Sequence, residues 1–168
     1  MRLTSHFEKL KDERQDFYLT LEELNQILIW KLRSQLGRQL KRREVNTDKN
    51  VLIITKAAFS VTHDNKDFET ILKIKLLSTL AGVEIPVASA ILTLCYPKEY
   101  SVIDVRNWRQ VYKTNKRKTN YTAKEYTDYL NKIKQWSKEY EVTPQEIDIA
   151  IWRKDTEISN KATANGKQ

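Results

Sequence analysis

The chain has 168 residues, enough for one ordinary domain that buries roughly two thirds of its unfolded surface. Hydrophobic residues make up 40% of the sequence and charged residues 31%, which is typical of a globular protein and not of a disordered one. With only 3 Gly and 3 Pro, the chain has too few turn residues for an all-β fold of this size. An all-α fold is therefore favoured.

The net charge of +8 suits an anionic partner such as nucleic acid, although a basic solvated surface gives the same charge. A single cysteine, Cys95, excludes an internal disulfide and a four-cysteine zinc or iron–sulfur site within the chain. It follows an apolar run, so we expect a buried thiol. The spacing of His6 and His63 fits no metal site, and we expect neither metal nor cofactor.

No apolar stretch resembles a signal peptide or a membrane span, so the default expectation is a cytoplasmic protein with no membrane association.

The first predicted element in the chain is a weakly amphipathic short helix over 3–16. Thr20 and Glu23 form a capping-box pattern that begins a second helix, and Gly37 ends it. A dense basic patch follows, made of Arg38, Lys41, Arg42 and Arg43.

Thr47 is a predicted N-cap for a helix that runs to Phe59. The β-branched stretch 51–54 within it also fits a strand, but its capped, lysine-flanked setting favours helix. Apolar residues at helical spacing predict the next helix over 68–80, and Gly82 ends it. Pro86 lies where the first turn of another helix begins, and that helix runs to Cys95.

A short loop then leads to Asp104 and a helix through Val111, followed by a basic loop over 113–118. Thr122 with Glu125 predicts a capped helix, and a further helix starts at Thr143. From about Thr156 the chain is polar and aperiodic, which predicts a disordered tail. We therefore expect one domain of about seven or eight helices over 1–155 and a tail over 156–168.

The segment from Leu80 to Leu92 has the pattern of a helical hairpin. An apolar helix stops at Gly82, turns within a few residues and restarts into a helix rich in small residues. Because the first backbone N–H groups of a helix are unpaired, the start of the second helix is a natural phosphate site. The alternative is an ordinary hairpin in a bundle, with Gly82 only as a C-cap. The candidate DNA contacts in the hairpin are Gly82, Val83, Glu84, Ile85 and Val87.

Downstream, Asp104 follows the apolar residues Val102 and Ile103 at the start of a helix. A carboxylate in this position either caps its helix or is held partly desolvated at the mouth of a cleft.

Together the hairpin segment and the segment around Asp104 resemble the helix-hairpin-helix superfamily of DNA glycosylases. The family pattern is a Leu-Pro-Gly-Val-Gly hairpin, then an alanine, then a Val-Asp-Thr segment with an arginine five residues after the aspartate. Here Leu80-Ala81-Gly82-Val83-Glu84, Ala88, Ile103-Asp104-Val105 and Arg109 match it without a gap, over about thirty residues.

The resemblance implies a mechanism. The hairpin holds the DNA backbone, the target nucleotide rotates out of the stack, and the aspartate assists cleavage of the N-glycosidic bond. Asp104 is then the catalytic residue. Glu84 replaces the second glycine of the hairpin and puts a negative charge where phosphate approaches. Bifunctional members carry a Schiff-base lysine in the hairpin, and Pro86 stands at that position here, so lyase chemistry by that route is not expected.

Trp30 and Lys31 lie on the helix that would form one wall of the pocket, where the indole stacks on a flipped base; the alternative is a core tryptophan beside a solvated lysine. Arg106 either pairs with Asp104 or reaches phosphate. The basic patch and the loop residues Lys116 and Arg117, with Arg109, are candidate phosphate contacts. The C-terminal tyrosines fit helix packing better than base stacking.

Three functions remain open on the sequence alone. The first is a monofunctional base-excision glycosylase, a hydrolase that acts on double-stranded DNA. The second is a non-catalytic DNA-binding module, and the third is a protein-interaction domain on the same scaffold. The sequence does not indicate the target base or the oligomeric state.

Overall fold

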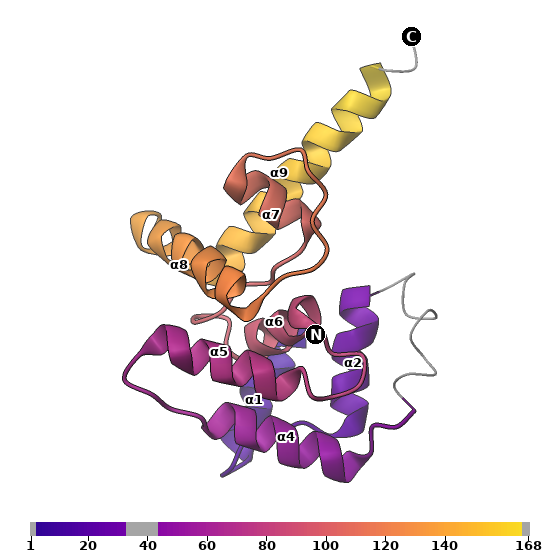
Figure 1. Ribbon diagram of the computed structural model, residues 1–168, viewed down its shortest axis with the longest axis vertical. Coiled ribbons are helices and arrows are strands. Elements are labelled where there is room, and N and C mark those ends of the chain that lie inside the picture. The colour runs from indigo at the N-terminus through magenta and orange to yellow at the C-terminus, as the bar shows by residue number, and fades with distance from the viewer. Residues whose placement is uncertain (1–2, 33–43, 166–168) are drawn as a thin grey trace.

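A computed structural model describes residues 3–32 and 44–165 of the chain. Within these ranges the chain forms helices and no strand, which confirms the predicted all-α fold of seven or eight helices. The helices are α1 (Leu3–Glu13), α2 (Leu21–Leu32), α4 (Asp48–Ser60), α5 (Lys66–Leu77), α6 (Ile85–Cys95), α7 (Val105–Tyr112), α8 (Ala123–Glu139) and α9 (Pro144–Asn165). Figure 1 shows α1, α2, α4, α5 and α6 grouped in one part of the molecule and α7, α8 and α9 in the other.

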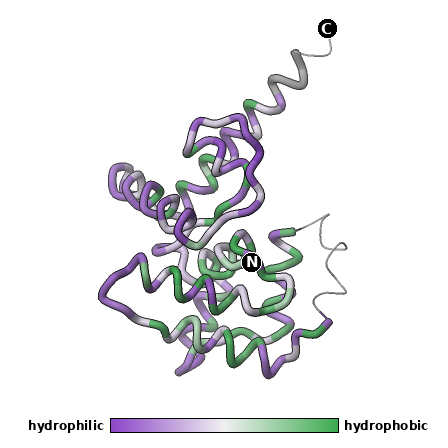
Figure 2. Tube along the Cα trace, in the orientation of Figure 1, coloured by the Kyte–Doolittle hydropathy of each residue, from purple (hydrophilic) through white to green (hydrophobic). Residues whose placement is uncertain are grey.

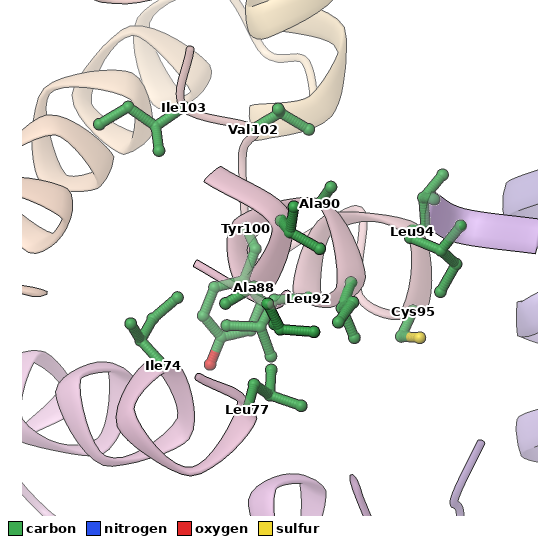
Figure 3. Packing of buried hydrophobic residues seen from close by; sticks show 14 of the residues in the cluster. Ile74, Leu77, Ala88, Ala90, Leu92, Leu94, Cys95, Tyr100, Val102 and Ile103 are labelled. Atoms are coloured by element: carbon green, nitrogen blue, oxygen red, sulfur yellow. The ribbon is translucent and has the colours of Figure 1, made fainter. Parts of the chain in front are cut away.

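Helix α6 is the centre of the larger group. Every residue from Val87 to Cys95 is buried, and α1, α2 and α5 pack around it. A helix that is apolar on all sides is stable only inside a core. Figure 3 shows side chains of α6 close to Ile74 and Leu77 of α5, with Ala88 and Ala90 as small residues on α6. The predicted burial of the Cys95 thiol is confirmed, and burial raises its pKa.

Several helices begin where capping residues predicted. Thr47 accepts a hydrogen bond from the Asn50 N–H at the start of α4, which also confirms helix over strand for 51–54. Thr122 and Glu125 form the full capping box of α8, with each side chain bonded to the backbone of the other residue. These local hydrogen bonds satisfy the first N–H groups of each helix, so the signals did not depend on tertiary packing.

The prediction of a disordered tail from Thr156 is wrong as far as Asn165, because α9 continues to that residue. The helical turn of α9 that contains Asp155 is anchored by a tertiary contact. The buried carboxylate of Asp155 binds the guanidinium of Arg109 on α7. No glycine or proline follows Pro144 within α9 to break the helix. The far end of α9 projects away from the other helices in Figure 1.

Polar and apolar residues are divided unevenly between the two groups of helices. Figure 2 shows many hydrophobic residues along α2 and α4, and mainly hydrophilic ones along α8 and the loop that precedes it. No helix in the described ranges is both long and apolar enough to cross a membrane.

Candidate active site and nucleic-acid interface

The predicted hairpin joins α5 to α6. Helix α5 ends at Leu77, so residues 78–80 belong to the turn. The predicted helix over 68–80 was therefore three residues too long at this end. Several backbone hydrogen bonds between an N–H group and the carbonyl three residues before it tighten the turn between α5 and α6. One of them runs from the Val83 N–H to the Leu80 carbonyl at 3.1 Å. Gly82 has a φ of 76°, a left-handed conformation that a side chain would strain. Gly82 is thus required for the shape of the turn.

Asn46 fixes the hairpin from outside, and the sequence analysis did not single it out. Its Nδ2 donates to the Ala81 carbonyl at 2.9 Å, and its Oδ1 accepts from the Ala81 N–H at 3.0 Å. The side chain is buried against the turn. Because both polar groups of Ala81 are satisfied by a single carboxamide, the turn has little freedom to change its conformation.

The extended segment before Asp104 is buried and held on several sides. The Tyr126 hydroxyl donates to the Ser101 carbonyl at 3.0 Å, and the Tyr129 hydroxyl donates to the Val102 carbonyl at 2.9 Å. The Ile103 N–H donates to Ser89 Oγ at 3.1 Å. Tyr126 and Tyr129 come from α8 and Ser89 from α6, so two helices set the position of the next residue. The predicted packing role of Tyr126 and Tyr129 is confirmed.

Asp104 uses its two carboxylate oxygens differently. Oδ1 accepts hydrogen bonds from the N–H groups of Arg106 and Asn107, both at 2.9 Å, and so caps α7. Oδ2 lies 3.6 Å from the Lys31 Nζ, and the side chain keeps 26% of its surface exposed. The two sequence interpretations of Asp104 are therefore compatible, because one oxygen caps the helix and the other lies beside Lys31 on a partly exposed side chain.

Asp104 lines a cavity of about 260 Å³ together with Trp30 and Lys31. The structure thus brings the three predicted pocket residues together from α2 and from the start of α7. Trp30 is 40% exposed, so it is not the core tryptophan of the alternative interpretation. The remaining lining residues are Val102, Asn107, Asp148, Ile149 and Trp152. The Oδ1 atom of Asn107 is buried and has no hydrogen-bond partner among the described residues.

Asp148 on α9 is the second carboxyl group of this cavity, and the sequence analysis missed it. Burial raises its pKa to about 7, although the Val102 N–H donates to its Oδ2 at 2.8 Å and Lys31 attracts it. One signal could have found it: an aspartate standing inside the otherwise apolar run from Ile147 to Ile151. Such a residue in a helix that packs on a core is either hydrogen-bonded or functional.

Lys31 is nearly enclosed, with 12% of its side chain exposed. Burial lowers the pKa of its ammonium group, and the carboxylates of Asp104 and Asp148 oppose that shift. Desolvation disfavours the charged form of an amine, while nearby negative charge favours it. Lys31 is therefore not the solvated surface lysine of the alternative interpretation.

A second cavity of about 680 Å³ connects Asp104 to the hairpin. Lys31, Asp104 and Trp152 line both cavities, so the two meet at the candidate catalytic carboxylate. The hairpin contributes four residues to the lining of this larger cavity, Gly82, Glu84, Pro86 and Val87. Three arginines also line it, Arg106, Arg109 and Arg117. The arrangement is a groove that runs from a helical hairpin to a small, partly apolar pocket.

No protein-family model, curated protein or solved structure matches this chain.

The remaining predicted contacts are distributed unevenly. Val83 and Ile85 line a hollow beside residues 119–121 that shares Glu84 and Pro86 with the larger cavity. Lys116 is exposed on the loop before α8. Glu84 is the exposed N-cap residue of α6, and its side chain makes no capping hydrogen bond. The four basic residues Arg38, Lys41, Arg42 and Arg43, and the predicted helix end at Gly37, lie outside the described residues.

The guanidinium groups of Arg106 and Arg109 are engaged by α9. Arg109 binds both oxygens of Asp155, at 2.9 and 2.5 Å. Arg106 binds Asp155 at 3.4 Å and Thr156 at 3.1 Å, whereas only its backbone N–H binds Asp104. The predicted side-chain pairing of Arg106 with Asp104 is thus replaced by pairing with Asp155. Both guanidiniums still line the larger cavity, where a phosphate would have to compete with Asp155.

Proposed function

We propose that the protein binds double-stranded DNA and excises a base from a flipped nucleotide, in the manner of helix-hairpin-helix DNA glycosylases. The observation that carries the proposal is the pairing of the two cavities at Asp104. One is lined by the hairpin and three arginines, and the other by two tryptophans and two carboxyl groups. Phosphate contacts and base contacts need these two different environments side by side.

The smaller cavity suits a single planar ligand. Its volume of about 260 Å³ is below the ~300–1,000 Å³ of pockets for drug-sized molecules. The indole side chains of Trp30 and Trp152 line this cavity, and base–aromatic stacking contributes about 1–3 kcal/mol per base. A base rotated out of a duplex can enter such a pocket while its sugar and phosphate remain in the larger groove.

Asp104 then lies at the junction of base and sugar. Its Oδ2 is free of the helix cap and can stabilise the positive charge that develops on the sugar as the N-glycosidic bond breaks, or can activate the attacking water. Asp148 and Lys31 stand beside it as further proton-carrying groups. Pro86 in the hairpin offers no amine, so the proposed reaction is hydrolysis of the base–sugar bond.

The test is excision by the variant Asp104→Asn. Asparagine keeps an oxygen that can cap α7, since it is among the preferred N-cap residues, but it removes the negative charge from the cavity. We expect DNA binding to be retained and abasic-site formation to fall about a hundred- to ten-thousandfold. The substrates are duplexes carrying a panel of damaged and modified bases, and abasic sites are read out as alkali-labile strand breaks.

The matched control is Asp128→Asn, the same chemical change on α8, where the carboxylate is about half exposed and pairs with Lys124. It should excise as the wild type does. Normal excision by Asp104→Asn would remove Asp104 from the mechanism. Salt-sensitive binding without base release from any duplex would instead indicate a non-catalytic DNA-binding module. Absence of binding at low salt, even with Glu84→Gly, would indicate a protein-interaction domain.

A further inference from the structure

Lys31 is the one residue of α2 that reaches both cavities while pairing with the candidate catalytic carboxylate. It stands in the last turn of α2, and its Nζ lies 3.6 Å from Asp104 Oδ2. The side chain is 12% exposed, and it lines both the larger groove and the smaller pocket. In the proposed complex the sugar of a flipped nucleotide lies between these two cavities, next to Lys31.

The surroundings make this amine a better nucleophile than a surface lysine. Burial lowers its pKa, so a larger fraction of Lys31 is neutral and carries a free electron pair. Asp104 Oδ2 can accept the proton that Lys31 gives up, since the two groups already form an ion pair. Neutral lysines in desolvated pockets add to carbonyl carbons and form imines.

We propose that Lys31 forms an imine with the aldehyde of an abasic site and cleaves the DNA strand on its 3′ side. The proposal rests on the proposed base excision, because removal of a base leaves a sugar whose ring-opened form carries an aldehyde at C1′. That carbon occupies the junction once the base has entered the smaller cavity. Lys31 thereby supplies from α2 the amine that Pro86 does not provide in the hairpin.

The reaction needs no oxidant or reductant. The neutral Nζ of Lys31 attacks C1′, the carbinolamine takes up a proton at its hydroxyl and loses water, and a protonated imine remains. A carboxylate of the site removes a proton from C2′, and the electron pair moves to expel the 3′-phosphate as the C3′–O bond breaks. Water then hydrolyses the imine, which returns the free amine and releases an unsaturated aldehyde on the 3′ end of the nicked strand.

The experiment uses the full chain and a duplex with a preformed abasic site, made by enzymatic removal of uracil from a uracil-containing duplex. Sodium borohydride reduces the imine to a stable secondary amine, so a trapped complex appears as a shifted band in a denaturing gel. We expect a trapped band for the wild type, a loss of at least tenfold for Lys31→Arg, and the adduct on the peptide that contains Lys31 by mass spectrometry. Arginine keeps the positive charge beside Asp104 but forms no imine.

The matched control is Lys134→Arg, because burial also lowers the pKa of Lys134, on α8, but that side chain lines neither cavity. It should be trapped as efficiently as the wild type. Unchanged trapping by Lys31→Arg, or an adduct on another residue, would overturn the assignment to Lys31. A wild type that gives no trapped band, whether or not it binds the abasic duplex in a mobility shift, would overturn the proposed imine. Because the abasic site is preformed, neither result depends on excision, which the Asp104→Asn assay measures separately.

Discussion

The carboxyl group of Asp148 accepts a hydrogen bond from the backbone N–H of Val102, 2.8 Å away. This contact joins α9 to the extended segment that ends at Asp104, so the second carboxyl group of the cavity also positions the first. Asp148 is buried, with Lys31 and Asp104 as the charged groups that act on it. Its protonation state therefore affects both the stability of the fold and the charge of the cavity.

The first prediction is that stability falls with rising pH because of Asp148. Burial raises its pKa in the folded protein to about 7, whereas an unfolded aspartate titrates near about 3.9. Between these two values the unfolded chain has lost the proton and the folded protein has kept it, so the free energy of unfolding decreases as pH rises. The loss is roughly 1.4 kcal/mol for each unit of pKa difference, and it ends above the folded pKa.

Asp148→Asn should remove this dependence, since asparagine can still accept the Val102 hydrogen bond but carries no proton to lose. Urea denaturation at pH 4, 5.5 and 7 checks it. As the pH is raised from 4 to 5.5 and then to 7, the free energy of unfolding of the variant should increase relative to that of the wild type. The total relative gain should be a few kcal/mol. A constant difference between the two proteins across this range would show that Asp148 is not a neutral acid in the folded state.

The second prediction concerns Asn46 and the hairpin turn. Asn46→Ala leaves the N–H and carbonyl of Ala81 without their partner, and an unsatisfied buried polar group costs about 1–3 kcal/mol. We expect that loss in the free energy of unfolding by urea, together with weaker DNA binding, because the turn of the hairpin is loosened. The control is Asn131→Ala, whose carboxamide binds Asp67 on the surface. Equal effects of the two substitutions would show that Asn46 does not hold the turn.

Much of the fold could be predicted because the decisive signals are local. Thr47 and Thr122 bond to N–H groups within three residues, so their caps can be recognised in the sequence itself. The apolar run before Cys95 predicted a buried thiol without knowledge of its neighbours, and Cys95 is buried in the core. The end of α9 could not be predicted in this way. Its anchor is a contact between Asp155 and Arg109, which lie far apart in the chain, and a polar stretch carries no sign of such a partner.

The candidate site was predicted in part, for the same reason. The hairpin and Asp104 lie within one segment, so their spacing could be compared with a known pattern. Trp30 and Lys31 were expected on one wall of a pocket, and both line the smaller cavity. The burial of Lys31 could not be predicted, because it depends on α7 and α9, which pack near it only in the fold. Asp148 and Asn46 contact the site from distant segments. The role of Asn46 follows from hydrogen bonds to backbone atoms, which leave no pattern in the sequence. Asp148 was marked only by its position inside the apolar run from Ile147 to Ile151.

The third prediction is that Asp155 restrains two arginines of the groove. Burial opposes ionisation of its carboxyl group, but hydrogen bonds from Arg109 and Gln110 outweigh it and hold the pKa of Asp155 below its usual value. A lowered folded pKa gives stability that is present above the unfolded pKa, near about 3.9, and is lost as pH falls through the folded value. Asp155→Asn should therefore reduce the free energy of unfolding at pH 7, and the difference from the wild type should vanish in acid.

The same variant frees the guanidiniums of Arg106 and Arg109 for phosphate. We expect the slope of log binding constant against log salt to become steeper by about 1 to 2, since each added phosphate contact contributes about 0.9 on duplex DNA. Fluorescence anisotropy at several salt concentrations measures the slope, under conditions where circular dichroism shows the variant folded. An unchanged slope would mean that these two arginines do not meet phosphate even when Asp155 no longer holds them.

The fourth prediction concerns the negative charge on the hairpin. Glu84 is exposed at the start of α6 and lines the larger cavity, where the proposal places phosphate. Glu84→Gln removes a repulsive charge while keeping the size of the side chain, and we expect duplex affinity at 0.1 M salt to rise about two- to fivefold, the scale of a single exposed charge interaction. Glu139→Gln on α8 makes the same change in net charge but lies at neither cavity, so it separates a local effect from a general one. Equal gains from both variants would mean that DNA responds to the net charge of the protein and not to the hairpin. A specific gain from Glu84→Gln would place phosphate at the start of α6, because repulsion between exposed charges is screened within about 10 Å at 0.1 M salt.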